Sequence, residues 1–87
     1  MEELTKEQID EVVKSIQMYK VISSNIVAIG YNETNKILRV LFKGNNSYLY
    51  FNVEPEVYNN LMSCESVGKT LNESVVRHKD KYKYIKL

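Results

Sequence analysis

The hydrophobic and polar positions of the first twenty residues follow the period of an amphipathic α-helix. Thr5 and Gln8 form a T-x-x-Q capping box, in which the two residues satisfy free backbone amides at a helix start. We therefore expect a helix from about residue 6 to residue 20. Its apolar stripe is spaced at intervals of three and four residues and consists of Ile9, Val12, Val13, Ile16 and Tyr19.

Residues 23–53 contain three segments whose β-branched, aromatic and alternating side chains are typical of strands. Turn residues separate the segments, NETN at 32–35 and GNN at 44–46. Because such short connections join antiparallel neighbours, we expect a three-stranded meander. The segments are SNIVAIGY ending at Tyr31, KILRVLFK at 36–43 and SYLYFNV at 47–53.

Alternation along the second and third strands separates their side chains into two faces. Arg39 is the lone charged residue of its face, which predicts that this face lies near solvent or a ligand. On the third strand, Tyr48 and Tyr50 share one face, and Leu49 and Phe51 share the other. One of these faces must pack on the core, so the other is available for a function.

The segment after the third strand predicts two short helices. Pro55 suits the first turn of a helix, and apolar residues follow at helical spacing. After the break ESVG at 65–68, Thr70 and Glu73 form a second capping box and predict the start of another helix. The C-terminal KYKYIKL alternates, which predicts either a fourth strand at the sheet edge or an ordered tail.

Together these elements predict an α+β fold: an N-terminal helix, a three-stranded antiparallel β-meander, two short helices and a basic extended C-terminal tail. The apolar stripe of the N-terminal helix must be covered, either by the sheet of its own chain or by a second copy. Because one small core is marginally stable, we favour a homodimer formed through this helix.

The composition excludes several classes of protein. With 87 residues the chain has the size of one domain, and its 44% hydrophobic and 26% charged residues are ordinary for a globular protein. No apolar run approaches the roughly 20 residues of a membrane helix, and the acidic start MEELTKEQ is unlike a signal peptide. One cysteine and one histidine exclude an internal disulfide and a four-ligand zinc site. We expect a cytoplasmic protein with no membrane association, metal or other cofactor.

The formal net charge of +1 hides an asymmetry between the two ends of the chain. Residues 1–11 carry five acidic side chains and one lysine, whereas residues 77–86 carry five basic side chains and one aspartate. The basic end is a candidate anion-binding surface through Arg77, Lys79 and Lys81. It fits equally well a solvated segment, or one that pairs with the acidic N-terminus.

Residues 66–70, SVGKT, end like a phosphate-binding P-loop. That motif needs a glycine at the position where this chain has Ser63, which argues against a true P-loop. Lys69 can still meet an anion beside the helix start predicted at Thr70. Neither His78 nor Cys64 has a neighbour in the sequence that would mark a catalytic pair, so we expect a protein that is not an enzyme.

The tyrosines carry the main functional signal of the sequence. Tyr48 and Tyr50 form one Y-x-Y pair, and Tyr82 and Tyr84 form another. Aromatic rings along a strand can stack nucleic-acid bases while nearby cations meet the phosphates. Any single tyrosine is also an ordinary strand residue that fills a small core.

An ordered set of short motifs runs through residues 21–85. It consists of Ser23-Ser24, Ile26, IGY at 29–31, Thr34, Leu38-x-Val40-x-Phe42, Gly44, Tyr48-x-Tyr50, Val53, Val57-Tyr58, Leu61, Ser66-x-Gly68-Lys69 and Asn72. In this order the motifs resemble the KTSC domain, named for the C-terminus of certain lysyl-tRNA synthetases and also found as small stand-alone proteins of bacteria and phages. The resemblance implies a KTSC-like domain at 21–87, preceded by the amphipathic helix at 1–20.

Two features depart from the family pattern. Glu54 separates the strand-ending Val53 from Pro55, and Thr70 and Leu71 stand where relatives often carry aromatic residues. The second departure weakens a stacking role for that loop. For function, the family implies RNA binding, which rests on its association with a synthetase and not on the fold itself.

We therefore expect a non-catalytic binding module for a phosphate-bearing ligand, most simply single-stranded RNA or DNA. Tyr48 and Tyr50 would stack bases. The cations expected to meet phosphates are Arg39, Lys69, Arg77, Lys79 and Lys81.

Two alternatives to nucleic-acid binding stay open. The chain could be an oligomeric sponge that sequesters a small nucleotide signal, as a phage would use against a host defence. It could also be a protein-interaction adaptor that uses the exposed face of the N-terminal helix. The near-neutral overall charge counts against nucleic-acid binding, because dedicated nucleic-acid binders usually have a clearly basic domain.

Overall fold

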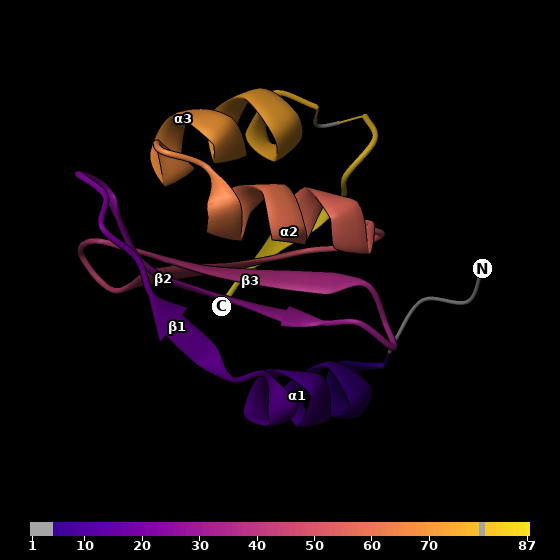
Figure 1. Cartoon of the computed structure of the whole chain (residues 1–87). Coiled ribbons are helices and arrows are strands. Elements are labelled where there is room, and N and C mark those ends of the chain that lie inside the picture. Colours follow the sequence, from indigo (N-terminus) through magenta and orange to yellow (C-terminus); the bar gives the residue numbers. More distant parts are fainter. Residues whose placement is uncertain (1–4, 79) are drawn as a thin grey trace.

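The computed structural model describes residues 5–78 and 80–87, and within them the chain forms one antiparallel sheet with helices on both faces (Figure 1). The strands lie in the order β1-β2-β3-β4-β5, so each pairs with its neighbour in the sequence. The predicted α+β class is confirmed, with five strands in place of the three expected. The elements are α1 (Lys6–Ser15), β1 (Met18–Lys20), β2 (Ile26–Asn32), β3 (Ile37–Phe42), β4 (Asn46–Tyr50), α2 (Pro55–Ser63), α3 (Val67–Leu71), the π-helix η1 (Asn72–Val76) and β5 (Tyr84–Lys86).

Helix α1 begins at the predicted capping box but ends earlier than predicted. The Thr5 side chain accepts a hydrogen bond from the Gln8 amide (3.1 Å), and the Gln8 side chain accepts one from the Thr5 amide (2.8 Å). The helix stops at Ser15, and Ile16 is already extended, with a ψ of 118°. The prediction of a helix to Lys20 is therefore wrong, because strand β1 pairs with the free edge of β2 instead. The hydrogen bonds between β1 and β2 favour a strand at residues 18–20, although Tyr19 continues the helical spacing of apolar residues.

The predicted meander is confirmed as β2, β3 and β4. Its one irregularity is a β-bulge between Ile26 and Ala28, where Val27 is the additional residue of β2. Because of this residue, Ile26 and Ile29 both point into the core on the same face, although they are three positions apart. The bulge lies next to the 21–25 loop, which precedes β2.

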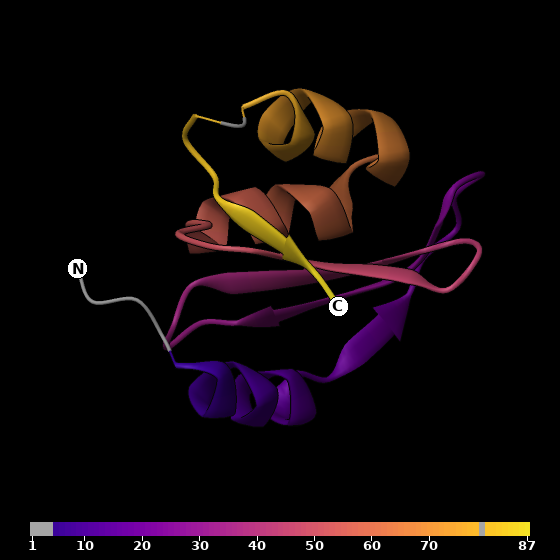
Figure 2. The ribbon, with the colours of Figure 1, turned by 180° about the vertical axis from the view of Figure 1, so that it is seen from behind.

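The basic C-terminal segment also ends in a strand, as one of the two alternatives expected. Strand β5 pairs antiparallel with β4 and places Tyr84 opposite Tyr50. Two further backbone bonds extend the pairing, from Phe51 to Lys83 (2.9 Å) and from Leu87 to Ser47 (2.8 Å). Figure 2 shows this segment returning from the helices to lie beside β4.

The second half of the chain contains the two short helices expected, although the second starts earlier than predicted. Helix α2 starts at Pro55, as proposed from the sequence. Helix α3 starts at Val67, and the Thr70 amide donates to the Ser66 carbonyl (3.0 Å), so Thr70 lies inside the helix. The predicted capping box at Thr70 and Glu73 is therefore wrong. None of the helices in the described part of the chain is long and apolar enough to cross a membrane.

The sheet separates two hydrophobic clusters. On one face, α1 packs on β3 and β4 through Val12, Ile16, Ile37 and Leu49. On the other face, α2, α3 and η1 cover a larger cluster whose buried members are Ile26, Ile29, Leu38, Val40, Tyr50, Val53, Leu61, Val67, Leu71, Val75 and Tyr82. Figure 1 shows α1 on the opposite side of the sheet from α2 and α3.

The apolar stripe of α1 is thus covered by the sheet of its own chain, which was one of the two alternatives expected for it. The covered stripe removes the argument that led us to favour a homodimer through this helix. The homodimer itself stays a prediction. Gly30 on β2 permits the close contact at this face, because a Cβ there would lie 2.6 Å from the Gln17 carbonyl oxygen and 2.8 Å from the Met18 sulfur.

Candidate functional site

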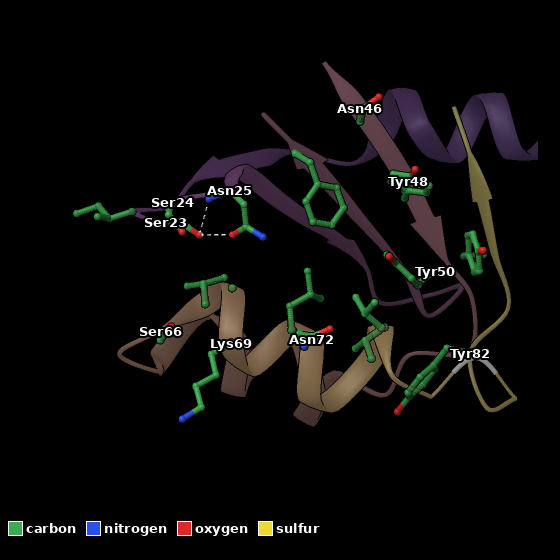
Figure 3. Close-up of a pocket in the computed structure, with 18 of the residues that line it drawn as sticks. Ser23, Ser24, Asn25, Asn46, Tyr48, Tyr50, Ser66, Lys69, Asn72 and Tyr82 are labelled. Atoms are coloured by element: carbon green, nitrogen blue, oxygen red, sulfur yellow. Dashed lines mark hydrogen bonds between the residues drawn. The ribbon is translucent and has the colours of Figure 1, made fainter. Parts of the chain in front are cut away.

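An open pocket of about 1090 Å³ lies between the β4 side of the sheet and the helical segment α3–η1 (Figure 3). We call it the β4–α3 pocket. Strands β3, β4 and β5 supply an aromatic wall. The 22–25 loop together with α3 and η1 supplies the opposite side, in which polar residues alternate with apolar ones such as Val67, Leu71 and Val75. The volume lies just above the range of small-molecule sites in proteins, which is about 300–1,000 Å³.

Three tyrosines in contact with one another form the aromatic wall. Tyr48 and Tyr50 project from β4 to the same face, and pairing with β5 brings Tyr84 beside them. Ring centroids lie 6.5 Å apart for Tyr48 and Tyr50, 6.1 Å for Tyr48 and Tyr84, and 5.8 Å for Tyr50 and Tyr84. Phe42 on β3 meets Tyr48 edge to face at 5.6 Å. Such tilted and edge-to-face contacts are favourable and hold each ring in place.

The three rings differ in how much of their surface a ligand could reach. Tyr50 is only 6% exposed, Tyr48 is half-buried, and Tyr84 is 46% exposed. Burial raises the pKa of Tyr50, with smaller contributions from Tyr48 and Tyr84, so its hydroxyl stays protonated well above neutral pH. Tyr50 therefore forms the floor of the pocket, whereas Tyr48 and Tyr84 offer ring surface to a ligand.

The rim opposite the tyrosines is polar and is fixed by local hydrogen bonds. The Ser23 hydroxyl donates to the Asn25 side chain (3.0 Å; Figure 3). It also accepts a hydrogen bond from the Ile26 amide (3.3 Å). Gly68 of α3 packs directly on this turn, because a Cβ there would meet the Asn25 side-chain oxygen at 2.8 Å. Asn72, the first residue of η1, also lines the pocket. π-Helical segments are rare and occur frequently at functional sites.

Two charged residues belong to the rim of the β4–α3 pocket, Glu65 and Lys69. Lys69 is exposed and extends from α3 on the side away from the sheet (Figure 3). The ammonium group of Lys69 can therefore approach a part of a ligand that extends out of the pocket. The pocket interior is therefore aromatic and neutral, with a positive charge available only at its edge.

The structure brings together only part of the predicted site. Tyr48, Tyr50 and Lys69 line the β4–α3 pocket. Arg77 caps the end of η1 and is exposed, and Lys81 is exposed with its ammonium 5.3 Å from the ring centroid of Tyr82; neither Arg77 nor Lys81 lines the pocket. Lys79, which we also predicted to meet phosphates, lies outside the described residues.

Arg39 lies on the opposite face of the sheet from the tyrosines. Its partner on β4 is Leu49, which belongs to the hydrophobic cluster covered by α1. The Nε of Arg39 donates to the Ser47 hydroxyl (3.2 Å). Tyr48 instead pairs with Val40, which faces the larger cluster. Arg39 therefore cannot meet the same ligand as Tyr48 and Tyr50, and the predicted grouping of these three residues is wrong.

Several lining residues were missing from the predicted site. Tyr84 was visible in the second Y-x-Y motif, but the sequence did not determine that its segment pairs with β4. The polar rim residues Ser23, Asn25, Asn46 and Asn72 carried no functional signal of their own. Ser23 and Asn72 belong to the motifs of the family resemblance, which was the only signal available for them.

The described residues contain no group of three or more His, Cys, Asp and Glu side chains that could hold a metal ion. Cys64 is half-buried and its thiol donates to the Leu61 carbonyl (3.2 Å). His78 is exposed, and its carbonyl accepts the amides of Lys81 and Tyr82 in a turn.

Comparison with known proteins identifies the family of this chain, and the matched segment includes the described residues that line the β4–α3 pocket. The model of the KTSC domain family matches residues 22–84, and the chain belongs to the KTSC domain family. A crystal structure of a KTSC domain protein from Yersinia pestis is similar, with a TM-score of 0.74 and 30% identity, over 84% of this chain and 99% of that chain. A protein of Tsukamurella paurometabola is 44% identical over 55 residues, which are 63% of this chain and 82% of the relative. The matched segment 22–84 contains the strands β2 to β4 and all three helical elements after them, and leaves α1 outside it.

Proposed function

We propose that this chain is a non-catalytic binding module whose β4–α3 pocket takes a phosphate-bearing ligand with a planar ring, that is, a nucleotide unit. The observation that supports the proposal is the exposed ring surface of Tyr48 and Tyr84 across the pocket from a polar rim. A base stacked on these rings would contribute about 1–3 kcal/mol, independent of its sequence. The amide groups of Asn25, Asn46 and Asn72 would satisfy the polar edge of the ring.

The arrangement of the cations favours a single small nucleotide over a long strand. Among the described residues, Lys69 is the cation that lines the pocket, whereas Arg39 faces the other side of the sheet. A strand of several nucleotides needs a continuous positive track along its phosphates, because most of its affinity comes from those contacts. The rim supplies one cation, Lys69, and one carboxylate, Glu65, so it has no row of positive charges for several phosphates.

Single-stranded RNA or DNA is the second candidate, and one observation favours it. Arg77 follows directly on η1, whose residues Val75 and Val76 line the pocket, and Lys81 lies in the turn after it. Phosphates beyond a bound nucleotide could reach these two cations. In that case the affinity would fall steeply with salt, with a slope of about −0.7 for each phosphate contacted by a single strand.

A ligand panel read by thermal shift and calorimetry tests the proposal. Nucleoside monophosphates, cyclic dinucleotides and short oligonucleotides would be titrated at low and high salt. A small nucleotide that binds one per site with a shallow salt dependence is the expected result. Tighter binding of oligonucleotides with a steep salt dependence would favour the second candidate. A panel in which no compound raises the unfolding temperature would reject both and leave the adaptor hypothesis.

Two substitutions connect binding to the β4–α3 pocket. Tyr84→Leu should weaken binding about tenfold because it removes a stacking surface from an exposed edge strand. Lys69→Gln should have a smaller effect and should reduce the salt dependence by about one charge. Tyr19→Leu, at a similarly exposed tyrosine that does not line this pocket, is the matched control and should leave binding unchanged.

A further inference from the structure

A second, smaller pocket lies between the β1–β2 edge of the sheet and the start of α2, and we call it the β1–α2 pocket. Its volume is about 380 Å³, and three tyrosines line it, Tyr19 of β1, Tyr31 of β2 and Tyr58 of α2. Glu33 and Pro55 also line this pocket. None of the residues that line the β4–α3 pocket is shared with this one.

Two of the three rings that line the β1–α2 pocket are in contact with each other. Tyr31 and Tyr58 stack with ring centroids 5.0 Å apart and planes 13° from parallel. Burial raises the pKa of Tyr58, and Tyr19, which lines the same pocket, adds to the shift. Tyr19 is 47% exposed, so its ring is open to a ligand that enters from solvent.

The electrostatics of this pocket are negative. Glu33 belongs to its wall, and no lysine or arginine is among the described residues that line it. Burial is the main cause that raises the pKa of Tyr31, and the carboxylates of Glu54, which pairs with Lys36 (3.3 Å), and Glu33 add to the shift.

Two of the hydroxyl groups that line the pocket, those of Tyr31 and Ser15, add to this negative character. The Tyr31 hydroxyl donates to the Val53 carbonyl, and the Ser15 hydroxyl donates to the Val12 carbonyl (2.8 Å). Each of these oxygens has its hydrogen engaged inside the protein, so only lone pairs remain for a ligand. The pocket can therefore accept hydrogen bonds and attract positive charge.

From these observations we propose that the β1–α2 pocket binds an organic cation, specifically a quaternary or methylated ammonium group. The faces of aromatic rings carry negative charge density and attract cations, and quaternary ammonium groups are recognised in this way by aromatic cages. Glu33 supplies the single full negative charge that one such head group requires.

The choice of a cation distinguishes this pocket from the β4–α3 pocket. There Lys69 stands at the rim together with Glu65 and can meet an anion, whereas here Glu33 is the charged side chain among the described lining residues and no lysine or arginine balances it. A nucleotide phosphate would be repelled by Glu33. The two proposals are therefore independent, and the failure of one leaves the other standing.

The test compares choline with its neutral isostere, in which a tert-butyl group replaces the trimethylammonium. Two-dimensional amide NMR spectra of the full chain would follow both titrations, together with free trimethyllysine as a second carrier of the same head group. We expect choline and trimethyllysine to shift amides around Tyr19, Glu33 and Tyr58, with affinity about tenfold above that of the neutral compound.

Two substitutions and one control locate the effect. Glu33→Gln removes the charge and keeps the size of the side chain, and Tyr19→Leu removes a ring from an exposed edge strand without opening the core. Each should weaken choline binding several-fold. Glu56→Gln, which removes an exposed carboxylate from the first turn of α2 outside the pocket, should leave it unchanged. Equal shifts with choline and the neutral isostere, or unchanged binding in the Glu33→Gln protein, would overturn the proposal.

Discussion

On one face of the sheet, α1 covers a small cluster, and on the other, α2, α3 and η1 cover a larger cluster with open pockets at its margins. The α1 face buries Ile37 and Leu49 completely and uses a glycine to bring backbone and side chains together. The opposite face also has a buried apolar cluster at its centre, but its outer residues are tyrosines, asparagines and serines that remain partly accessible.

The difference shows how a small domain can combine stability with accessible pockets. A single sheet has two faces, and an 87-residue chain has little apolar surface to distribute between them. Here the α1 face contributes to stability, so the other face can leave part of its surface open. Substitutions on the two faces should therefore have effects of different kinds.

The largest effect on stability should come from Leu49→Ala. Leu49 is fully buried against α1, and removing its side chain should lower the free energy of unfolding by about 2–5 kcal/mol. Tyr48→Leu, one position earlier on β4 and on the opposite face, should cost less because Tyr48 is only half-buried. Urea denaturation of both proteins measures the two values. Equal losses would contradict the division of roles between the faces.

A smaller contrast is expected between two glycines that lie on opposite faces. Gly30→Ala should destabilise the protein by about 1–3 kcal/mol, because the added Cβ would collide with the Gln17 carbonyl oxygen of the backbone. Gly68→Ala meets only the ends of the Asn25 and Ser23 side chains, which can move, and alanine favours a helix by up to about 1 kcal/mol.

We therefore expect Gly68→Ala to leave stability nearly unchanged and to alter ligand affinity at the pocket rim. Chemical denaturation and the ligand titrations described above provide the two readouts. A Gly68→Ala protein that is as unstable as Gly30→Ala would show that the rim is as rigid as the α1 face.

The smallest of the three effects concerns alkaline pH. The pKa of Tyr50 is raised in the folded state above its ordinary value of 10.0, so the folded protein holds this proton more tightly than the unfolded chain. Its contribution to stability is therefore complete below pH 10.0 and is lost as the pH rises through the folded-state pKa. The urea midpoint of the natural protein should fall more steeply than that of Tyr50→Phe as the pH rises from about 9 to about 11. Parallel curves for the two proteins would contradict this assignment.

The sequence predicted the parts of the fold that local chemistry determines. The capping box at Thr5, the turns at 32–35 and 44–46 and the proline start of α2 all involve residues within a few positions of one another. The end of α1 was not predictable in this way, because β1 forms only when the edge of β2 is available to it. The same holds for β5, whose partner β4 lies more than thirty residues earlier in the sequence.

The candidate site could be predicted only in part for the same reason. Tyr48 and Tyr50 were recognised from a local motif, but their separation from Arg39 depends on the register between β3 and β4. That register pairs Val40 with Tyr48, and a shift of one residue would have placed Arg39 on the tyrosine face. The pocket itself is formed by a loop, three strands and two helical segments, and no local pattern encodes such an assembly.

The additional residue at Val27 has a consequence for how this domain can vary. Because Val27 is an additional residue, the alternation of side chains between the two faces is interrupted there. The loop before β2 therefore does not have to follow the alternation of the paired residues from Ala28 onward. Insertions or deletions upstream can then rotate the Ser23–Asn25 turn relative to α3 while every pair from Ala28 onward keeps its partner. A chain built in this way can change the shape of the entrance to the β4–α3 pocket by single-residue steps and leave the sheet beneath it intact.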